Sequence, residues 1–264
     1  EVGIARTRAH FRDWEEVREI EELFCLHVAR AKRFIYAESQ YFASRRIVEA
    51  ILKRLEEDDP PEIVIVHPHN ADGWLEQQAM DHTRAELVRL IEQTDTHRRF
   101  SIWSPISGDT RIYVHAKIMI VDDQILRIGS ANMNNRSMGL DSECDLFIDA
   151  ARPANKGAER QIAKLRHSLL AEHCGLDEAE VPELLERHGS MAGLIEHCPV
   201  GSARRLERYH PPELTDSQSA IARSQLLDPE NPQDLLEPYA GGGLYQERSR
   251  LARIRNRIKR KARK

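Results

Sequence analysis

Four polar side chains that can bind and activate a phosphate ester lie close together in this sequence. His115 and Lys117 stand two residues apart in an apolar run, and Ser130 and Asn132 follow Gly129. An imidazole can act as a nucleophile or as a general acid near neutral pH. An ammonium group with hydroxyl and amide donors beside it stabilises negative charge on the oxygens bonded to phosphorus. The combination indicates phosphodiester chemistry, for which we expect neither a metal nor another cofactor.

Two strands of a hairpin are predicted to bring these side chains together. Side chains on a strand alternate between its faces, so His115 and Lys117 share one face and the apolar residues between and after them turn to the core. If Asp122 and Asp123 form a two-residue turn, counting outward places His115 directly opposite Ser130. The four polar side chains then share one face of the hairpin.

Two carboxylates and a glycine complete the predicted site. A catalytic imidazole needs a partner for its second nitrogen, and Glu143, at the start of the next predicted strand, is the candidate, with a plain edge charge as the alternative. Asp122 lies at the far end of the strand from His115, so we expect it to hold the hairpin and not to touch substrate. Gly129 is expected to let the backbone approach the ligand closely.

Alternating helical and strand patterns predict a layered α/β domain over residues 1–175. The predicted helices span 15–32, 45–57, 74–93 and 155–173, and the predicted strands span 34–37, 63–66, 100–103, 111–121, 125–129 and 144–148. Ser44 is expected to cap the second helix. Prolines punctuate residues 176–243, which we expect to form an extended or partly helical appendage packed on the domain. Residues 244–264 form a basic amphipathic tail.

Charge is distributed very unevenly along the 264 residues. The total is −4, but residues 247–264 hold ten Lys or Arg against one Glu, which leaves −13 for the rest. An acidic body disfavours polyanionic nucleic acid as a substrate. The basic tail could bind anionic lipid headgroups, contact nucleic acid or form a solvated helix. No apolar run reaches the roughly eighteen residues that a membrane-spanning helix needs.

Other candidate sites carry weaker signals. His67 and His69 have no further ligand at metal spacing, so the exit of a strand is the better interpretation. Gln40 could line the site or cap backbone, and Trp74 could reach the pocket mouth but more readily anchors a helix. The cysteines form no CxxC pair, which indicates reduced residues of a cytosolic protein. They are Cys25, Cys144, Cys174 and Cys198.

The complete spacing resembles the signature of the phospholipase D superfamily. It reads His-x-Lys, four residues, Asp, six residues, Gly-Ser-x-Asn, and then a Glu thirteen residues after the Ser. The segments 38–42 and 134–141 are similar to the second half of the two-motif phospholipases, and the resemblance covers about residues 4–174. It implies a layered α/β/α sandwich of the phospholipase D type, with one half-unit followed by a C-terminal appendage.

Membership of this superfamily implies a two-step reaction at a site where two such motifs face each other. One histidine forms a phosphohistidine and the other protonates the leaving alcohol. The chain carries a single motif, and its second-half context implies that His115 is the general acid and base. The nucleophile would come from an amino-terminal half that is missing here, or from a second copy of the chain.

The resemblance leaves three functions open. The leading one is a phosphodiesterase or phosphatidyltransferase that acts on glycerophospholipids at the cytoplasmic side of a membrane. An endonuclease of the same superfamily, working as a homodimer, is the second. The third is an inert half-site that serves membrane recruitment.

Overall fold

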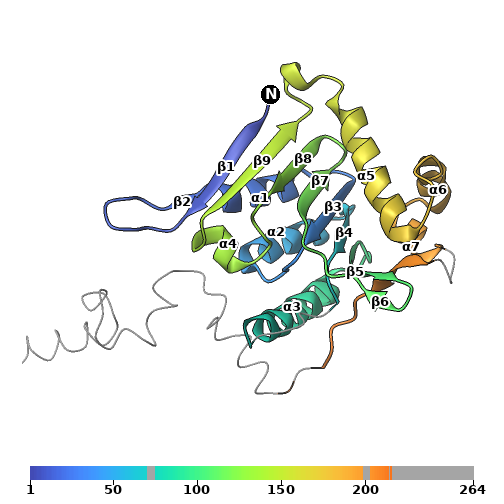
Figure 1. The fold of residues 1–264 in the computed structure, drawn as a ribbon, viewed down its shortest axis with the longest axis horizontal. Helices are drawn as coiled ribbons and strands as arrows, with labels where there is room; N and C mark the ends of the chain where they lie inside the picture. The colour runs from blue at the N-terminus through green and yellow to red at the C-terminus, as the bar shows by residue number, and fades with distance from the viewer. Residues whose placement is uncertain (70–74, 199–202, 214, 216–264) are drawn as a thin grey trace, which may run out of the picture.

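A single mixed β-sheet organises the chain, for which the computed structural model describes residues 1–69, 75–198, 203–213 and 215 (Figure 1). The strands are β1 (Gly3–Arg8), β2 (Val17–Arg18), β3 (Phe34–Ser39), β4 (Glu62–Val66), β5 (Phe100–Ser107), β6 (Thr110–Arg111), β7 (Lys117–Val121), β8 (Ile125–Gly129), β9 (Glu143–Asp149) and β10 (Arg204–Arg208). The helices are α1 (Glu19–Arg30), α2 (Arg45–Leu55), α3 (Leu75–Thr94), α4 (Asn135–Gly139), α5 (Ala158–Cys174), α6 (Val181–His188) and α7 (Met191–Glu196), with a 3₁₀ turn at Pro153–Asn155.

Within the described residues the strand order is β10-β5-β4-β3-β7-β8-β9-β1-β2, with β6 paired to β5. β3, β4 and β5 run parallel, and the helices that connect them cross one face of the sheet. From β3 through β7, β8, β9 and β1 to β2, each neighbouring pair is antiparallel. β4 is buried along its whole length, as expected for a β-branched strand covered on both faces.

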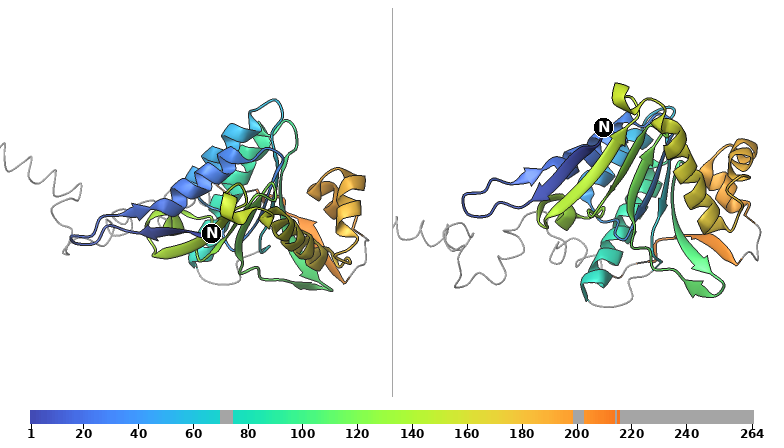
Figure 2. Two further views of the ribbon diagram at one scale, coloured as in Figure 1. Left: turned by 90° about the horizontal axis from the view of Figure 1, so that it is seen from above. Right: turned by 45° about the horizontal axis from the view of Figure 1, so that its top comes forward.

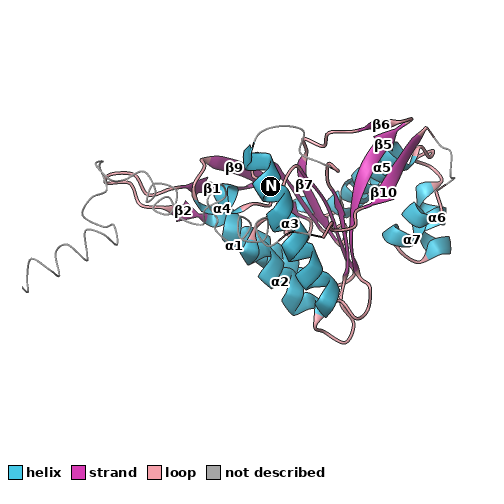
Figure 3. Ribbon diagram, turned by 90° about the horizontal axis from the view of Figure 1, so that it is seen from below, coloured by secondary structure: helices cyan, strands magenta, loops and turns pink. Residues whose placement is uncertain are grey.

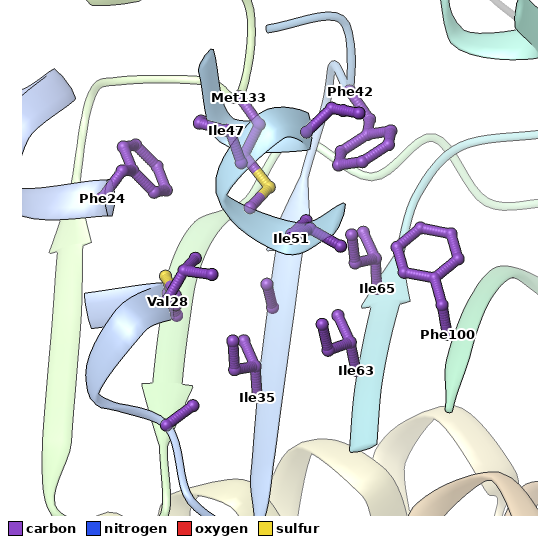
Figure 4. Close-up of a cluster of buried hydrophobic side chains, with 14 of the residues drawn as sticks. Phe24, Val28, Ile35, Phe42, Ile47, Ile51, Ile63, Ile65, Phe100 and Met133 are labelled. Atoms are coloured by element: carbon purple, nitrogen blue, oxygen red, sulfur yellow. The ribbon is translucent and has the colours of Figure 1, made fainter. Parts of the chain in front are cut away.

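Helices cover both faces of the sheet, which makes the fold a layered α/β/α sandwich (Figures 2 and 3). The α1–α3 core packs apolar side chains of those helices against the sheet. Figure 4 labels ten of its members: Phe24, Val28, Ile35, Phe42, Ile47, Ile51, Ile63, Ile65, Phe100 and Met133. The α5–α7 core on the other face includes Tyr36, Val64, Trp103, Ile120, Ile162, Leu170, Val181, Met191 and Leu194.

The structure confirms the predicted fold class, and the predicted helices and central strands lie within a few residues of their observed positions. Ser44 caps α2, because its hydroxyl accepts a hydrogen bond from the Ile47 amide at 3.4 Å. Some features of the sheet differ from those expected. The strand predicted to begin at residue 111 begins at Lys117, and residues 112–116 have no regular structure. The first strands, β1 and β2, were not predicted.

The register of the β7–β8 hairpin differs by one residue from the expected one. Val121 pairs with Ile125, not with Gln124, so three residues connect the strands. Asp122 and Asp123 both adopt left-handed backbone conformations, with φ of 55° and 58°. The carbonyl of Gln124 accepts a hydrogen bond from the Ala150 amide at 2.8 Å, which draws Gln124 toward β9. Extending this register puts Lys117 opposite Gly129, so the predicted pairing of His115 with Ser130 is wrong.

The segment after Cys174 contributes to the same layers. Helices α6 and α7 pack into the α5–α7 core, and β10 pairs with β5 at one edge of the sheet. The change at residue 175 that the prolines indicated therefore does not coincide with the end of the sheet, and the domain boundaries remain a prediction. Trp74 and the basic tail at residues 244–264 lie outside the described residues. No helix in the described part of the chain has the length and apolarity needed to span a membrane.

Candidate active site

Lys117 begins β7 at the edge of the sheet where the other predicted site residues gather. Its ammonium group is half-buried and donates a hydrogen bond to Gln40 Oε1 at 3.2 Å. Burial lowers the pKa of Lys117, and the nearby negative charge of Glu143 opposes this shift. The Lys117 and Glu143 side chains are thus close enough to interact electrostatically across the site.

His115 lies in the irregular segment that precedes β7, and its side chain is exposed. Its imidazole makes no hydrogen bond with any residue that the structure describes. The predicted contact between His115 and Glu143 is therefore absent from this structure. An exposed imidazole next to the half-buried start of a strand is accessible to a substrate or to a second protein surface.

Glu143, the first residue of β9, accepts hydrogen bonds from two serines and none from His115. Its carboxylate accepts hydrogen bonds from the Ser130 hydroxyl and, at 2.7 Å, from the Ser137 hydroxyl. The Ser130 oxygen in turn accepts a hydrogen bond from the Cys144 amide at 3.0 Å. These contacts fix the orientation of the Ser130 hydroxyl. Glu143 therefore holds Ser130 and Ser137 in position at this edge of the sheet.

Asn132 lies in the loop that follows β8 and is mostly buried. Its backbone amide donates to the Ser137 hydroxyl at 3.1 Å, which ties it to Glu143 through one intermediate residue. The side-chain oxygen of Asn132 is buried and accepts no hydrogen bond from the described residues. Buried polar groups are normally hydrogen-bonded. This oxygen has no partner among the described residues, but it is shielded from solvent and, as an acceptor, does not bind an anion.

The structure gives a different reason for a glycine at position 129 from the one expected. A Cβ at this position would lie 1.8 Å from Asp145 Oδ1. Asp145 is fully buried and forms an ion pair with Arg127, whose guanidinium lies 3.4 Å from the centroid of the Phe24 ring. The glycine therefore makes room for a buried ion pair beneath the loop, and the structure gives no sign that a ligand requires it.

Asp122 lies at the opposite end of β7 from Lys117. Its carboxylate accepts hydrogen bonds from three consecutive backbone amides, those of Lys32, Arg33 and Phe34, at 2.7, 2.8 and 2.8 Å. These bonds fasten the β7–β8 turn to the start of β3. The position suits a structural residue that is remote from the reacting groups.

Of three further contributors to this edge, the sequence left Gln40 open between lining the site and capping backbone, and did not single out the other two. The Gln40 amide donates to the Tyr113 hydroxyl at 2.8 Å while its oxygen accepts from Lys117, so it links the two sides of the site. Gln40 lies in the segment 38–42 that resembles the family, and that signal could have included it. Ser137 lies in the segment 134–141, which carried the same kind of signal, whereas the Arg127–Asp145 pair had none, because it depends on a contact between separate strands.

The structure thus gathers Lys117, Ser130, Asn132 and Glu143 at one edge of the sheet, with His115 exposed before β7. This set offers one cation and one side-chain amide to an anion, and one imidazole that can transfer a proton, whereas the Ser130 hydroxyl already donates its proton to Glu143. The assignment of individual catalytic roles to these residues remains a prediction.

Comparisons with known proteins found relatives in sequence and similar solved structures. The chain is 28% identical over 215 residues to phospholipase D zeta 1 of Arabidopsis thaliana, covering 60% of this chain but only 19% of that protein. Among solved structures, it is similar to phosphatidylserine synthase of Haemophilus influenzae, at 13% identity and a TM-score of 0.48, covering 75% of this chain and 47% of that one. It is also similar to Nuc of Salmonella typhimurium, a phospholipase D family member, at 16% identity and a TM-score of 0.41, covering 63% of this chain and 91% of that one.

The chain therefore spans about a fifth of the length of the plant phospholipase D that it matches. The family model described as phospholipase D matches residues 78–221, which is more than half of the chain and includes every residue of the predicted motif. The chain belongs to the phospholipase D family.

Proposed function

We propose that this chain is one half of a phosphodiesterase site that cleaves or transfers the phosphatidyl group of glycerophospholipids at the cytoplasmic face of a membrane. The observation that carries the proposal is the grouping of Lys117, Ser130 and Asn132 at the start of β7, two residues after His115, whose exposed imidazole has no hydrogen-bond partner among the described residues. Lys117 neutralises a non-bridging phosphate oxygen, the amide nitrogen of Asn132 donates to the same group, and the Ser130 hydroxyl does so by turning from Glu143 to the phosphate. The four free cysteines fit a reducing compartment.

The proposed reaction has two balanced steps. A second histidine, from the complementary half, forms a bond from nitrogen to phosphorus while the bond from phosphorus to the leaving alcohol breaks, and protonated His115 gives its proton to that alcohol oxygen. Neutral His115 then takes a proton from water or an acceptor alcohol, whose oxygen attacks phosphorus as the phosphorus–nitrogen bond breaks. His115 returns to its protonated state at the end of the cycle.

An exposed aliphatic row beside the site supports the need for a complementary half. Ile4, Leu146 and Ile128 lie directly opposite one another on β1, β9 and β8, and they are 63%, 49% and 47% exposed. Ile118 connects the row to the α5–α7 core, because it pairs with Ile128 and packs against that core. Ser130 follows Ile128 by two residues at the active-site edge. A second half-unit packed on this row would meet the site directly.

A lipid substrate is favoured by charge. The chain without its last eighteen residues carries about −13, which repels the phosphate backbone of a nucleic acid. A single phosphodiester in a lipid headgroup needs only local cations such as Lys117. An endonuclease is therefore the less favoured function, and the plasmid assay below tests it.

The test is to incubate the chain with phosphatidylcholine and ethanol, and separately with a supercoiled plasmid, over a range of protein concentrations. We expect phosphatidylethanol, with a rate that rises as the square of concentration if a second copy completes the site. His115→Asn should abolish the product, whereas His97→Asn, an exposed histidine in the α3–β5 connection, should not. Plasmid nicking without phosphatidylethanol would overturn the lipid assignment, and silence in both assays would mean that this chain alone is a recruitment half-site.

A further inference from the structure

We infer that the tip of the β1–β2 hairpin is a membrane-docking element that inserts two aromatic side chains into the interfacial region of a phospholipid bilayer. The inference goes beyond the proposed chemistry, because docking needs no turnover, and it rests on the proposed function only for its purpose. Figures 1 and 2 show this hairpin projecting away from the sheet and the helices. Its tip carries Phe11 and Trp14, which are 54% and 60% exposed.

The tip is an ordered structure and not a loose loop. Phe11 and Trp14 exchange both backbone hydrogen bonds, at 3.2 and 2.9 Å, and Arg12 between them adopts a left-handed conformation with φ of 53°. The Arg8 guanidinium lies 4.9 Å from the centroid of the Trp14 ring and donates to the Glu15 carbonyl at 2.9 Å. The tip that carries the two rings is therefore already ordered before it meets a membrane. Little conformational entropy is then lost when the rings enter the bilayer.

Each ring is paired with a cation in the way that suits a membrane interface. The Arg12 guanidinium lies 5.0 Å from the centroid of the Phe11 ring, which matches the arrangement of Arg8 on Trp14. Tryptophan favours the headgroup level of a bilayer, where its ring meets acyl carbon and its N–H remains hydrated. Guanidinium groups at the same level can bind lipid phosphates in a bidentate manner.

The hairpin leaves the sheet at the edge that holds the candidate active site. Thr7, near the end of β1, pairs with Glu143, and Glu143 anchors Ser130 and Ser137. From Arg8 the hairpin extends only a few residues further, a reach of about 10–15 Å at the usual rise of a strand. A bilayer that receives the tip would thus lie beside the residues that act on its headgroups.

The charge near the tip indicates whether it favours an anionic or a zwitterionic bilayer. Arg8 and Arg12 are more than offset by Asp13, Glu15 and Glu16, which leaves the tip with a net charge of −1. Attraction to an anionic surface is then weak, and burial of the two rings supplies the binding. The expected partner is a bilayer rich in zwitterionic lipid, bound with little dependence on salt. A basic segment would behave in the opposite way, with binding that needs anionic lipid and falls as salt rises.

The experiment measures cosedimentation of the chain with phosphatidylcholine vesicles at low and high salt. A double variant, Phe11→Ala with Trp14→Ala, is compared with a matched control, Leu26→Ala with Leu90→Ala, which removes exposed apolar side chains from α1 and α3. We expect the double variant to lower the partition coefficient by about tenfold or more, which follows from the apolar area that two rings bury. The control should bind like the parent chain, and salt should change neither result.

A second measurement keeps the inference testable if the double variant does not fold. Brominated phosphatidylcholine should quench part of the fluorescence of the parent chain, and Trp14→Phe should remove that part while leaving vesicle binding intact. Equal binding by the parent and the double variant, or no quenching assigned to Trp14, would overturn the inference. So would a tip whose removal changes self-association and not vesicle binding, because the aromatic pair would then contact protein.

Separate experiments can contradict the proposed function and the proposed docking. Hydrolysis of a monomeric short-chain phosphatidylcholine requires the active site but no bilayer. Turnover of that substrate without vesicle binding overturns the docking element alone. Vesicle binding that depends on Trp14, without turnover of any phosphodiester, overturns the proposed function alone.

Discussion

The Ser130 hydroxyl donates a hydrogen bond to the Glu143 carboxylate and accepts one from the Cys144 amide, so its oxygen is fixed from both sides. The other carboxylate oxygen accepts from Ser137, whose hydroxyl also accepts from the Asn132 amide. One carboxylate therefore positions two of the three groups proposed to bind phosphate. Glu143 acts in this structure as a positioning residue for Ser130 and Asn132, without a contact to His115.

Replacement of Glu143 tests this relationship. In Glu143→Gln the amide nitrogen cannot accept a hydrogen bond, so one of the two serine hydroxyls loses its acceptor. We expect phosphodiester turnover to fall by about 10–100-fold, as is typical when a supporting hydrogen bond is removed. The measurement is kcat and KM with a soluble phosphodiester, with exposed Glu22→Gln as the control. If Glu143→Gln left both constants unchanged, Glu143 would be a plain edge charge.

A side chain at Gly129 tests the packing beneath the loop. The added Cβ of Gly129→Ala would meet Asp145 at 1.8 Å and disturb its buried pairing with Arg127. Overpacking of this kind costs about 1–3 kcal/mol, and weakening of the ion pair adds to it. We expect urea denaturation to show a loss of at least about 2 kcal/mol in the free energy of unfolding.

The control for that substitution is Gly108→Ala. Gly108 has a positive φ of 59° and no atom within 4 Å of an added Cβ, so it measures backbone strain without a clash. We expect a loss of about 1 kcal/mol there. Equal losses at the two glycines would show that the Asp145 clash relaxes without cost.

The sequence predicts well the elements whose periodicity is set by burial alone. The β-branched run of β4 and the apolar stripe of α1 lie where their patterns indicate, because each is decided by neighbours close in the chain. The hairpin register is different. Its one-residue shift depends on left-handed backbone at Asp122 and Asp123 and on a hydrogen bond between Gln124 and Ala150, which belongs to another strand connection.

The edge strands illustrate the same limit. β10 has arginines and a glutamate around one buried leucine, Leu206, and only its pairing with β5 makes it a strand. The site is similar: the motif spacing indicates the residues that lie near Lys117, but not that His115 lies apart from Glu143, that Glu143 accepts from serines or that Gln40 binds Lys117. Those contacts follow from tertiary packing, which propensity and spacing do not encode.

Loss of the Asp122 carboxylate tests its structural role. Asp122→Ala removes the acceptor of three amide hydrogen bonds and places alanine in a left-handed conformation that it adopts poorly. We expect a loss of about 2–4 kcal/mol in the free energy of unfolding. Asp122→Asn should lose less, because asparagine tolerates this backbone and keeps one acceptor. Urea denaturation of both variants provides the measurement, and equal stability of Asp122→Ala and the parent chain would contradict the role.

Acid sensitivity of the fold is expected from His27. Its imidazole is buried on α1, and burial, followed by the positive charges of Arg127 and Arg30, lowers its pKa to about 4. The unfolded chain binds this proton below about pH 6.5, whereas the folded chain resists it until about pH 4. Stability is therefore fully present above pH 6.5 and is lost as the pH falls toward 4, by about 3 kcal/mol.

The variant His27→Leu should reduce this loss. Leucine keeps an apolar contact with Phe147, whose ring centroid lies 5.8 Å from that of His27, and it binds no proton. His67, buried beside Arg84 with its pKa also lowered, should supply the slope that remains. The measurement is the free energy of unfolding in urea at about pH 7 and about pH 5, with His97→Leu as the exposed control. A slope between these pH values that is the same in His27→Leu and in the parent chain would show that His27 does not stay neutral in the folded protein.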